Sequence, residues 1–185
     1  MDLNILQKNR GDLMSENHSL ISKMFEYNVW AFNLVWNCVE ELTDEQFCQE
    51  IDYSHGSIRN QIVHVISTCE RWLERIQGRM APDYLENDAF PTKKITRERW
   101  DVFCGETRRW LGTLSEDDLT RSFHWALPHR KLEANSTVGE ILLHLFNHAT
   151  DHRAQILADL HYGFHARTVE QDLLFFLAEE QAKRE

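Results

Sequence analysis

The chain has 185 residues, of which 42% are hydrophobic and 11% aromatic, so it has the material for one domain with a substantial core. Its formal net charge of -10 argues against a nucleic-acid backbone or an anionic membrane as the main partner, because both are negatively charged. The sequence shows no export segment, no apolar run of membrane-spanning length and no C-x-x-C pair among its four cysteines, so we expect a cytoplasmic protein with reduced thiols.

Hydrophobic periodicity predicts two long helices in the first half of the chain. After an approach segment over residues 1–14, Ser15 or Asn17 is expected to cap a helix whose apolar stripe runs from Leu20 to Leu42. A second helix is expected from about Ser57 to Gln77, where Gly78 ends it. These two helices can supply half of a helical core.

The second half of the chain is predicted to hold two more long helices and a short terminal one. Residues 78–95 have the composition of a long loop, and Thr96 is expected to cap the third helix. Residues 121–133 are the only strand-like stretch and predict a small hairpin or extended loop. A capping box formed by Thr137 and Glu140 opens the fourth helix, which is expected to end near Gly163, and Thr168 is expected to start the terminal helix. Four long amphipathic helices predict an all-α four-helix bundle.

Three histidines of the fourth helix, His144, His148 and His152, are spaced four residues apart. Adjacent members are about 5–6 Å apart at Cβ, close enough to share one ion, whereas the outer two are about 12 Å apart along the axis. Helical phase places His152 and His148 beside the core and directs His144 toward solvent. The helix can therefore supply two metal ligands, and a third must come from elsewhere. The alternative is three amphipathic histidines on a wet face, because H-x-x-x-H alone is only moderately specific.

His64, on the second helix, is about 130° from the centre of that helix's apolar stripe. Periodicity alone therefore favours an exposed His64. A position in a groove between helices, with Val63 packing on the other side, is the alternative. Asp151 and Asp159 are carboxylates that can orient ligating imidazoles or simply face solvent.

Several segments together resemble the DinB/YfiT-like family over about residues 20–178. The matching motifs are Tyr27-Asn28-x-Trp30-Ala31, Ser54-x-Gly56-Ser57-Ile58, His64 with Trp72 and Gly78, Asn147-His148-x-x-x-His152-Arg153-x-Gln155, Gly163, and Asp172 with the Leu-Leu-Phe-Phe that follows it. The family usually has Gly where this chain has Ala154. The resemblance implies one domain over residues 1–185, an up-up-down-down four-helix bundle with an additional short C-terminal helix, and a homodimer.

The resemblance also implies one divalent metal ion held by His64, His148 and His152. Three neutral imidazoles leave positions open for other ligands, which is typical of catalytic rather than structural sites. The family points to a metal-dependent enzyme of the thiol-dependent transferase type, with a small-molecule substrate and a low-molecular-weight thiol as a further cofactor. A metal-dependent hydrolase is the alternative, as is a non-catalytic metal-binding bundle that acts through dimerisation or a protein partner. The sequence assigns no catalytic residue and does not choose among nickel, zinc, iron and manganese.

Overall fold

The structure is a computed structural model that describes the backbone of residues 3–185 and the side chains from residue 17 onward. Its elements, in chain order, are α1 (Leu3–Val39), α2 (Asp44–Cys48), α3 (Ile58–Ile76), the 3-10 turn η1 (Asn87–Ala89), α4 (Lys93–Leu111), α5 (Glu116–Thr120), β1 (Ser122–Leu127), the 3-10 turn η2 (Pro128–Arg130), β2 (Leu132–Thr137), α6 (Val138–Ala158), the π-helical turn η3 (Asp159–Gly163) and α7 (Leu173–Ala182). The protein is mostly helical, with one small two-stranded sheet in the described part of the chain.

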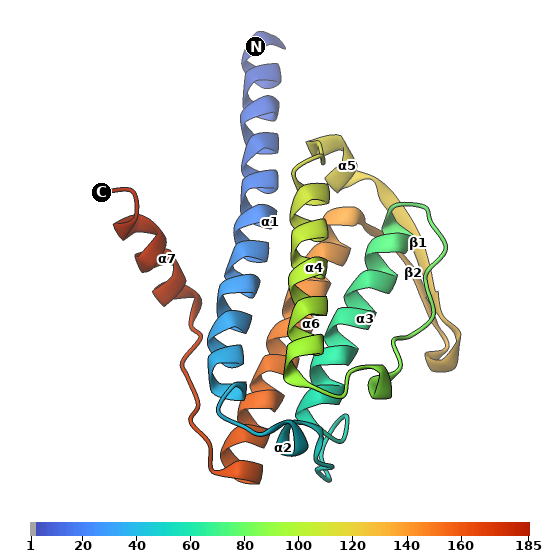
Figure 1. Ribbon diagram of the computed structural model, residues 1–185. Helices are drawn as coiled ribbons and strands as arrows, with labels where there is room; N and C mark the ends of the chain where they lie inside the picture. Colours follow the sequence, from blue (N-terminus) through green and yellow to red (C-terminus); the bar gives the residue numbers. More distant parts are fainter. Residues whose placement is uncertain (1–2) are drawn as a thin grey trace.

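The four long helices α1, α3, α4 and α6 lie side by side (Figure 1). Helices α1 and α3 each contact both α4 and α6, so the four enclose a common core. Residues of three of these helices are completely buried there, among them Phe32, Ile62, Ile66, Leu142 and Ile156. Packing of these apolar faces is the main source of stability for helices of this kind.

The helices do not follow the up-up-down-down order that the family resemblance implied. Helices α1 and α6 run in one direction, and α3 and α4 run in the opposite direction (Figure 1). Residues 40–57 stay at one end of the molecule because α2 and tight turns take up their length, so α3 returns antiparallel to α1. Residues 77–92 form a longer connection that can reach about 50 Å when extended. This exceeds the roughly 28 Å length of α4, so α4 can start at the same end as α3.

The predicted ends of α3 and the predicted start of α6 are confirmed. The Ser57 side chain accepts a hydrogen bond from the Asn60 amide at the start of α3, and the Thr137–Glu140 capping box opens α6. Gly78, at φ +75°, follows α3 in a left-handed conformation that suits glycine. Helix α4 is capped by Thr92 rather than by Thr96, which is buried inside its first turns.

The two ends of the chain differ from expectation. Helix α1 begins at Leu3, so the approach segment predicted over residues 1–14 and the cap at Ser15 or Asn17 are wrong. No proline interrupts residues 3–39, and helix formation can therefore continue through them. The terminal helix α7 starts after its N-cap Asp172, not at Thr168. It lies against α1, where Phe176 packs on Tyr27 and Trp30.

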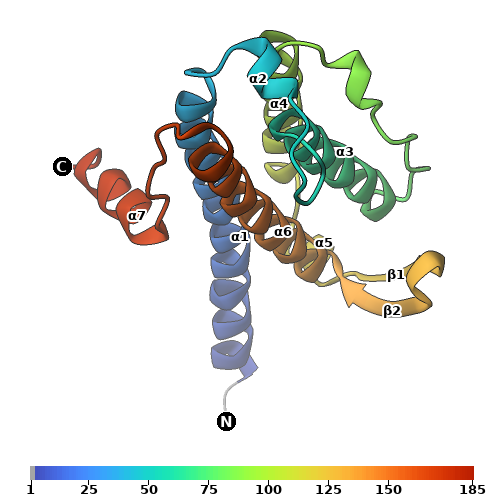
Figure 2. The same cartoon turned by 90° about the horizontal axis from the view of Figure 1, so that it is seen from below.

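A β-hairpin connects α5 to α6 and projects to one side of the helices (Figure 2). Strands β1 and β2 are antiparallel, with Phe123 opposite Ser136 and Trp125 opposite Ala134. The hairpin was expected over residues 121–133, but its second strand continues to Thr137. These strands also correct the purely helical fold class. The rings of Phe123 and Trp125 pack edge-on against Trp72 of α3, with centroids 6.4 and 6.1 Å away, and this contact holds the hairpin beside α3.

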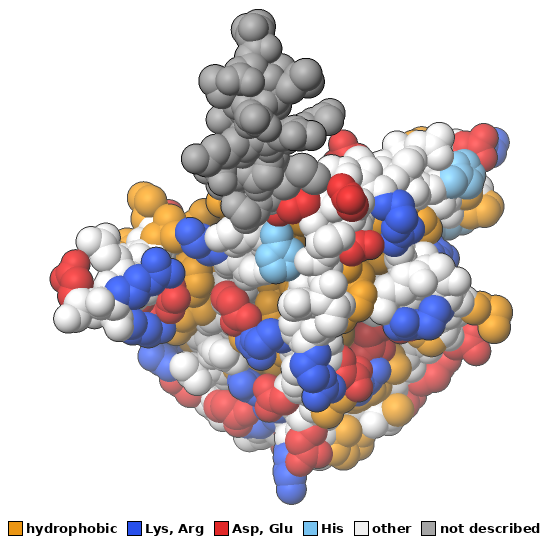
Figure 3. Space-filling view, turned by 90° about the horizontal axis from the view of Figure 1, so that it is seen from above, with side chains coloured by type: hydrophobic (Ala, Val, Ile, Leu, Met, Phe, Trp, Pro, Cys, Tyr) orange, Lys and Arg blue, Asp and Glu red, His pale blue; other side chains and the backbone are white. Residues whose placement is uncertain are grey.

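Acidic and basic side chains alternate over the end of the molecule from which α1 projects (Figure 3). Ion pairs connect the helices or reinforce them on the outside, including Arg108 with Glu26 at 2.6 Å and Arg97 with Asp101 at 2.9 Å. Such exposed pairs contribute little to stability individually. None of the helices in the described residues combines the length and the apolar character needed to traverse a bilayer.

Candidate metal centre

Helices α3 and α6 bring the three predicted histidines together. His64 Nε2 lies 3.4 Å from His148 Nε2, and His148 Nε2 lies 3.1 Å from His152 Nε2. Nitrogen ligands at about 2.05 Å from a tetrahedrally coordinated zinc ion are about 3.3 Å from each other. The two measured separations are close to that value. His148 is therefore spaced from each of the other two imidazoles as ligands of a single ion are.

The position of His64 differs from the one that periodicity favoured. Its ring is half-buried and faces α6, with the His152 ring centroid 4.8 Å away. The periodicity argument assumed that this helix buries a single face. In the structure, α3 packs against α2, α4 and α6 and buries residues around most of its circumference, including Gln61 and Val63. The alternative of a groove between helices is therefore the one that the structure shows.

The three histidines of α6 differ in exposure as their helical phase predicted. His152 is buried, with 6% of its surface exposed, His148 is half-buried and His144 is exposed. The His144 ring lies 5.9 Å from that of His148 and stands edge-on to Trp72 at 6.1 Å. His144 therefore borders the cluster from the side of the hairpin.

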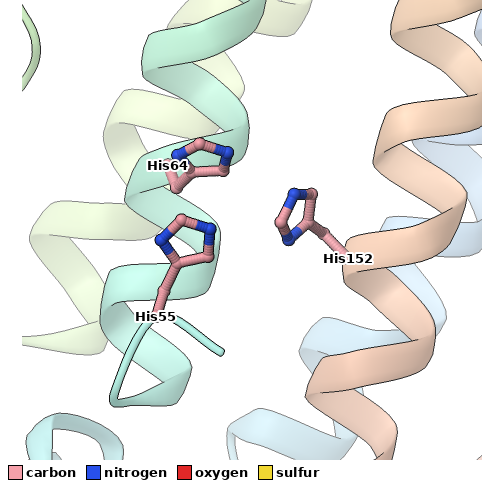
Figure 4. Close-up of side chains that lie close together, drawn as sticks. All are labelled: His55, His64 and His152. Atoms are coloured by element: carbon pink, nitrogen blue, oxygen red, sulfur yellow. The ribbon is translucent and has the colours of Figure 1, made fainter. Parts of the chain in front are cut away.

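A fourth imidazole, His55, was missed in the sequence. Its ring stacks on His64 with centroids 3.9 Å apart, and both rings face His152 across the gap between α3 and α6 (Figure 4). One ligand nitrogen from each of His55, His64 and His152 lies within 4.8 Å of the others. The only signal in the sequence was the position of His55 just before Ser57, the residue that caps α3. That cap makes the preceding turn fold over the start of the helix, near His64.

Buried amides fix the orientation of His152. Its Nδ1 is 2.6 Å from Oε1 of Gln61, which is completely buried. Gln155 donates to the Asp151 carboxylate through Nε2 and accepts from Gln61 Nε2 through Oε1, at 3.3 and 3.0 Å. Because a carboxylate only accepts, this chain leaves Gln61 Oε1 as an acceptor for the His152 Nδ1–H group. His152 therefore carries its proton on Nδ1 and presents the Nε2 lone pair to the cluster.

The group that orients His152 is thus the Gln61 amide, and not Asp151 or Asp159, the two carboxylates that the sequence suggested. Asp151 contributes only through Gln155, at the exposed end of the chain of hydrogen bonds. Asp159 is buried in η3, and its Oδ2 has no hydrogen-bond partner in the described structure. A hydrogen-bonded glutamine can fix an imidazole tautomer as a backbone carbonyl does.

Burial and mutual repulsion keep the imidazoles neutral. Burial, with help from the neighbouring His55 and His148, lowers the pKa of His64 to about 4. Burial likewise lowers the pKa of His148 to about 4 with help from His152, and that of His152 to about 4 with help from His64. Burial also lowers the pKa of His55. Near neutral pH these side chains carry free lone pairs, which is the form that binds transition metals.

The donor set fits a borderline transition metal. All the candidate ligands are imidazole nitrogens, which suit zinc, nickel and iron better than the hard, oxygen-seeking magnesium and calcium. Three imidazole ligands would leave at least one coordination position of such an ion for a further ligand. His148 Nδ1 is buried without a hydrogen-bond partner in the described structure.

A helical fold with a histidine cluster between two antiparallel helices defines a DinB-like class of protein, and comparisons with known proteins agree. The chain is 29% identical over 166 residues to Protein DinB of Bacillus subtilis (strain 168), which covers 86% of this chain and 95% of that protein. A crystal structure of a DinB-like protein from Bacillus cereus ATCC 10987 superposes with a TM-score of 0.62 at 15% identity, over 80% of this chain and 94% of that one. The DinB family model matches residues 14–176. The chain belongs to the DinB family.

Proposed function

We propose that His64, His148 and His152 bind one divalent transition-metal ion, and that the protein is a metal-dependent enzyme of the thiol-dependent transferase type. The observation that supports the proposal is that His148 Nε2 lies 3.4 Å from His64 Nε2 and 3.1 Å from His152 Nε2. The pKa of each of these imidazoles is lowered to about 4, so they are neutral near pH 7. Nickel, zinc, iron and manganese all remain candidates, because imidazole accepts each of them.

A divalent ion at this position would lower the pKa of a bound thiol or water and polarise a substrate oxygen. The chain's own residues orient and shield the site. Gln61 holds His152 in one tautomer, and the α3–α6 packing fixes His64 relative to the two histidines of α6. Beside His148, the exposed His144 ring offers a face that an organic substrate can contact.

Transfer to or from a small thiol is preferred to hydrolysis because thiol chemistry is what the resemblance to the family implied, and the chain belongs to that family. The assay that separates the two loads the protein with each candidate metal and supplies a low-molecular-weight thiol together with an electrophilic substrate. A thioether product that requires both metal and thiol supports the transferase. A product formed from water, without the thiol, would assign hydrolysis instead.

Metal binding itself is tested by elemental analysis of the purified protein and its variants. Wild type is expected to hold about one ion per chain, whereas His64→Ala and His148→Ala are expected to hold much less, because each variant lacks one of the proposed ligands. His161→Ala is the control, since His161 is an exposed histidine of η3. A full complement of metal in both ligand variants would reject the assignment.

We also infer that the four side-by-side helices form a four-helix bundle and that the whole chain is one domain. The support is the shared core of α1, α3, α4 and α6. The homodimer, the cytoplasmic location and the lack of nucleic-acid or membrane partners stay predictions. Sedimentation of the purified protein tests the dimer. A dimer without any activity on thiol substrates would favour the non-catalytic alternative.

A further inference from the structure

The loop before α3 holds the backbone of His55 firmly while leaving its side chain exposed. Ser54 and Gly56 adopt left-handed conformations, with φ of +48° and +85°, which fold the loop tightly. The Asn60 side chain donates to the His55 carbonyl oxygen at 2.9 Å. Ser54 Oγ donates to Gln155 Oε1, so the loop is also connected to α6. Fixed at both flanks, this turn keeps the His55 ring beside the cluster and still allows the ring to rotate.

The His55 ring is placed to approach an ion held by the other histidines. Its centroid is 3.9 Å from that of His64 and 5.3 Å from that of His152. The nitrogens of the three residues lie within 4.8 Å of one another, whereas tetrahedral ligands are about 3.3 Å apart. A ring movement of about 1.5 Å closes that difference. Rotation of an exposed side chain about its first two bonds easily achieves it.

His144 is the other exposed imidazole beside the cluster, and its geometry is less suitable. The centroid of its ring lies 5.9 Å from that of His148 and 6.1 Å from that of Trp72. It is also one helical turn beyond His148, and therefore about 12 Å along α6 from His152. Of the two exposed rings, only His55 shares a group of closely spaced nitrogens with His64 and His152.

We propose that His55 is a fourth, exchangeable imidazole ligand, which occupies the open position of the ion held by His64, His148 and His152 and leaves it when an anionic ligand enters. The two kinds of ligand differ in how firmly their side chains are held, which supports one exchangeable and three permanent ligands. His152 is buried and fixed by Gln61, whereas the His55 side chain is exposed and its ring stacks on that of His64. The site is thus closed by four nitrogens at rest and opens on the side of the 49–57 loop.

This inference rests on the proposed metal site, and cobalt substitution tests the two separately. Four-coordinate Co²⁺ absorbs visible light much more strongly than five- or six-coordinate Co²⁺. Wild-type protein titrated with Co²⁺ is expected to show the strong band. His55→Ala and His55→Gln are expected to show the weaker one, because without the imidazole more than one water can bind and raise the coordination number above four. Affinity for Co²⁺ should fall at least about tenfold in both variants, the lower end of the effect of removing a partner from a metal site.

His144→Ala is the matched control and should keep both the spectrum and the affinity of wild type. Azide, added to the Co²⁺ proteins, should bind His55→Ala at a lower concentration than wild type, because no side chain then competes for the open position. Circular dichroism checks that the variants are folded. Spectra, Co²⁺ affinities and azide midpoints identical to wild type in both His55 variants would overturn the role of His55 and leave the three-histidine site intact. Failure of wild type to bind Co²⁺ at all would overturn the metal site itself.

Discussion

Replacing Gln61 by leucine should weaken metal binding without touching a ligand. The change keeps the side chain close to its original size but removes the oxygen that accepts the His152 Nδ1–H group at 2.6 Å. It also removes the donor to Gln155 Oε1. Because residue 61 is completely buried, water cannot readily replace either partner. The imidazole then loses both its fixed tautomer and its fixed orientation.

The magnitude follows from these two losses. Removing a partner that orients a metal-bound histidine typically weakens affinity about 10- to 100-fold, or about 1.4 to 2.8 kcal/mol. The metal-free protein should lose about 1–3 kcal/mol of unfolding free energy, since the buried His152 N–H is left without an acceptor. Gln61→Glu behaves differently because its carboxylate still accepts from His152. Its metal affinity should equal or exceed that of wild type.

Competition with a chromophoric chelator measures the Zn²⁺ affinity of each variant. The matched control is Gln77→Leu, the same chemical change at the other end of α3, where the amide bonds to the Leu73 carbonyl and not to a histidine. Its affinity should not change. Equal Zn²⁺ affinities for Gln61→Leu and wild type would refute the reasoning that this amide orients His152.

Three further predictions concern stability. Burial raises the pKa of the Asp159 carboxyl to about 6, so the folded state loses stability as the pH rises from about 4 to about 6. In urea unfolding, Asp159→Asn should therefore have a free energy of unfolding about 2–3 kcal/mol above that of wild type at pH 8, and the same as wild type at pH 3.5. Arg153→Met should lose at least about 3 kcal/mol by the same measurement, because the completely buried guanidinium donates to Asn28 Oδ1 and Gln171 Oε1, and these two oxygens lose their donor. Zn²⁺ at about 100 times its dissociation constant should stabilise the wild type by about 2.7 kcal/mol in calorimetry and EDTA should reverse this, whereas His148→Ala should not respond. Each argument has its own contradicting result. These are a stability gain of Asp159→Asn that does not depend on pH, a free energy of unfolding of Arg153→Met equal to that of wild type, and stabilisation of His148→Ala by Zn²⁺.

The helices could be predicted from the sequence because their signals are local. Apolar stripes and capping side chains located α3 and α6 to within a residue or two at their first turns, where Ser57 and Thr137 act as caps. The start of α1 and the direction of the helices were not predictable in this way. A helix without a clear stop signal continues as far as its backbone allows, and the order of directions depends on where each connection leads the chain.

The residues of the candidate site likewise differ in whether local sequence signals could predict them. His148 and His152 share one helix face, so their spacing and phase could be derived from the sequence alone. His64 required the resemblance to a family, because a helix in contact with several neighbours has no single buried face. His55 could not be found, because its approach to His64 depends on left-handed backbone at Ser54 and Gly56 and on hydrogen bonds to distant residues.

The cluster depends on the packing of α3 against α6, and the two should stabilise each other. His64 belongs to α3, whereas His148 and His152 belong to α6, so an ion shared among them would connect the two helices directly. Gln155 adds a second connection, since its Oε1 accepts from both Gln61 of α3 and Ser54 of the preceding loop. The residue that orients His152 and the loop that carries His55 therefore meet at one acceptor. Under the proposal, a rigid pair of helices holds three ligands in place, while the ring of the fourth rotates on a turn whose backbone is itself fixed.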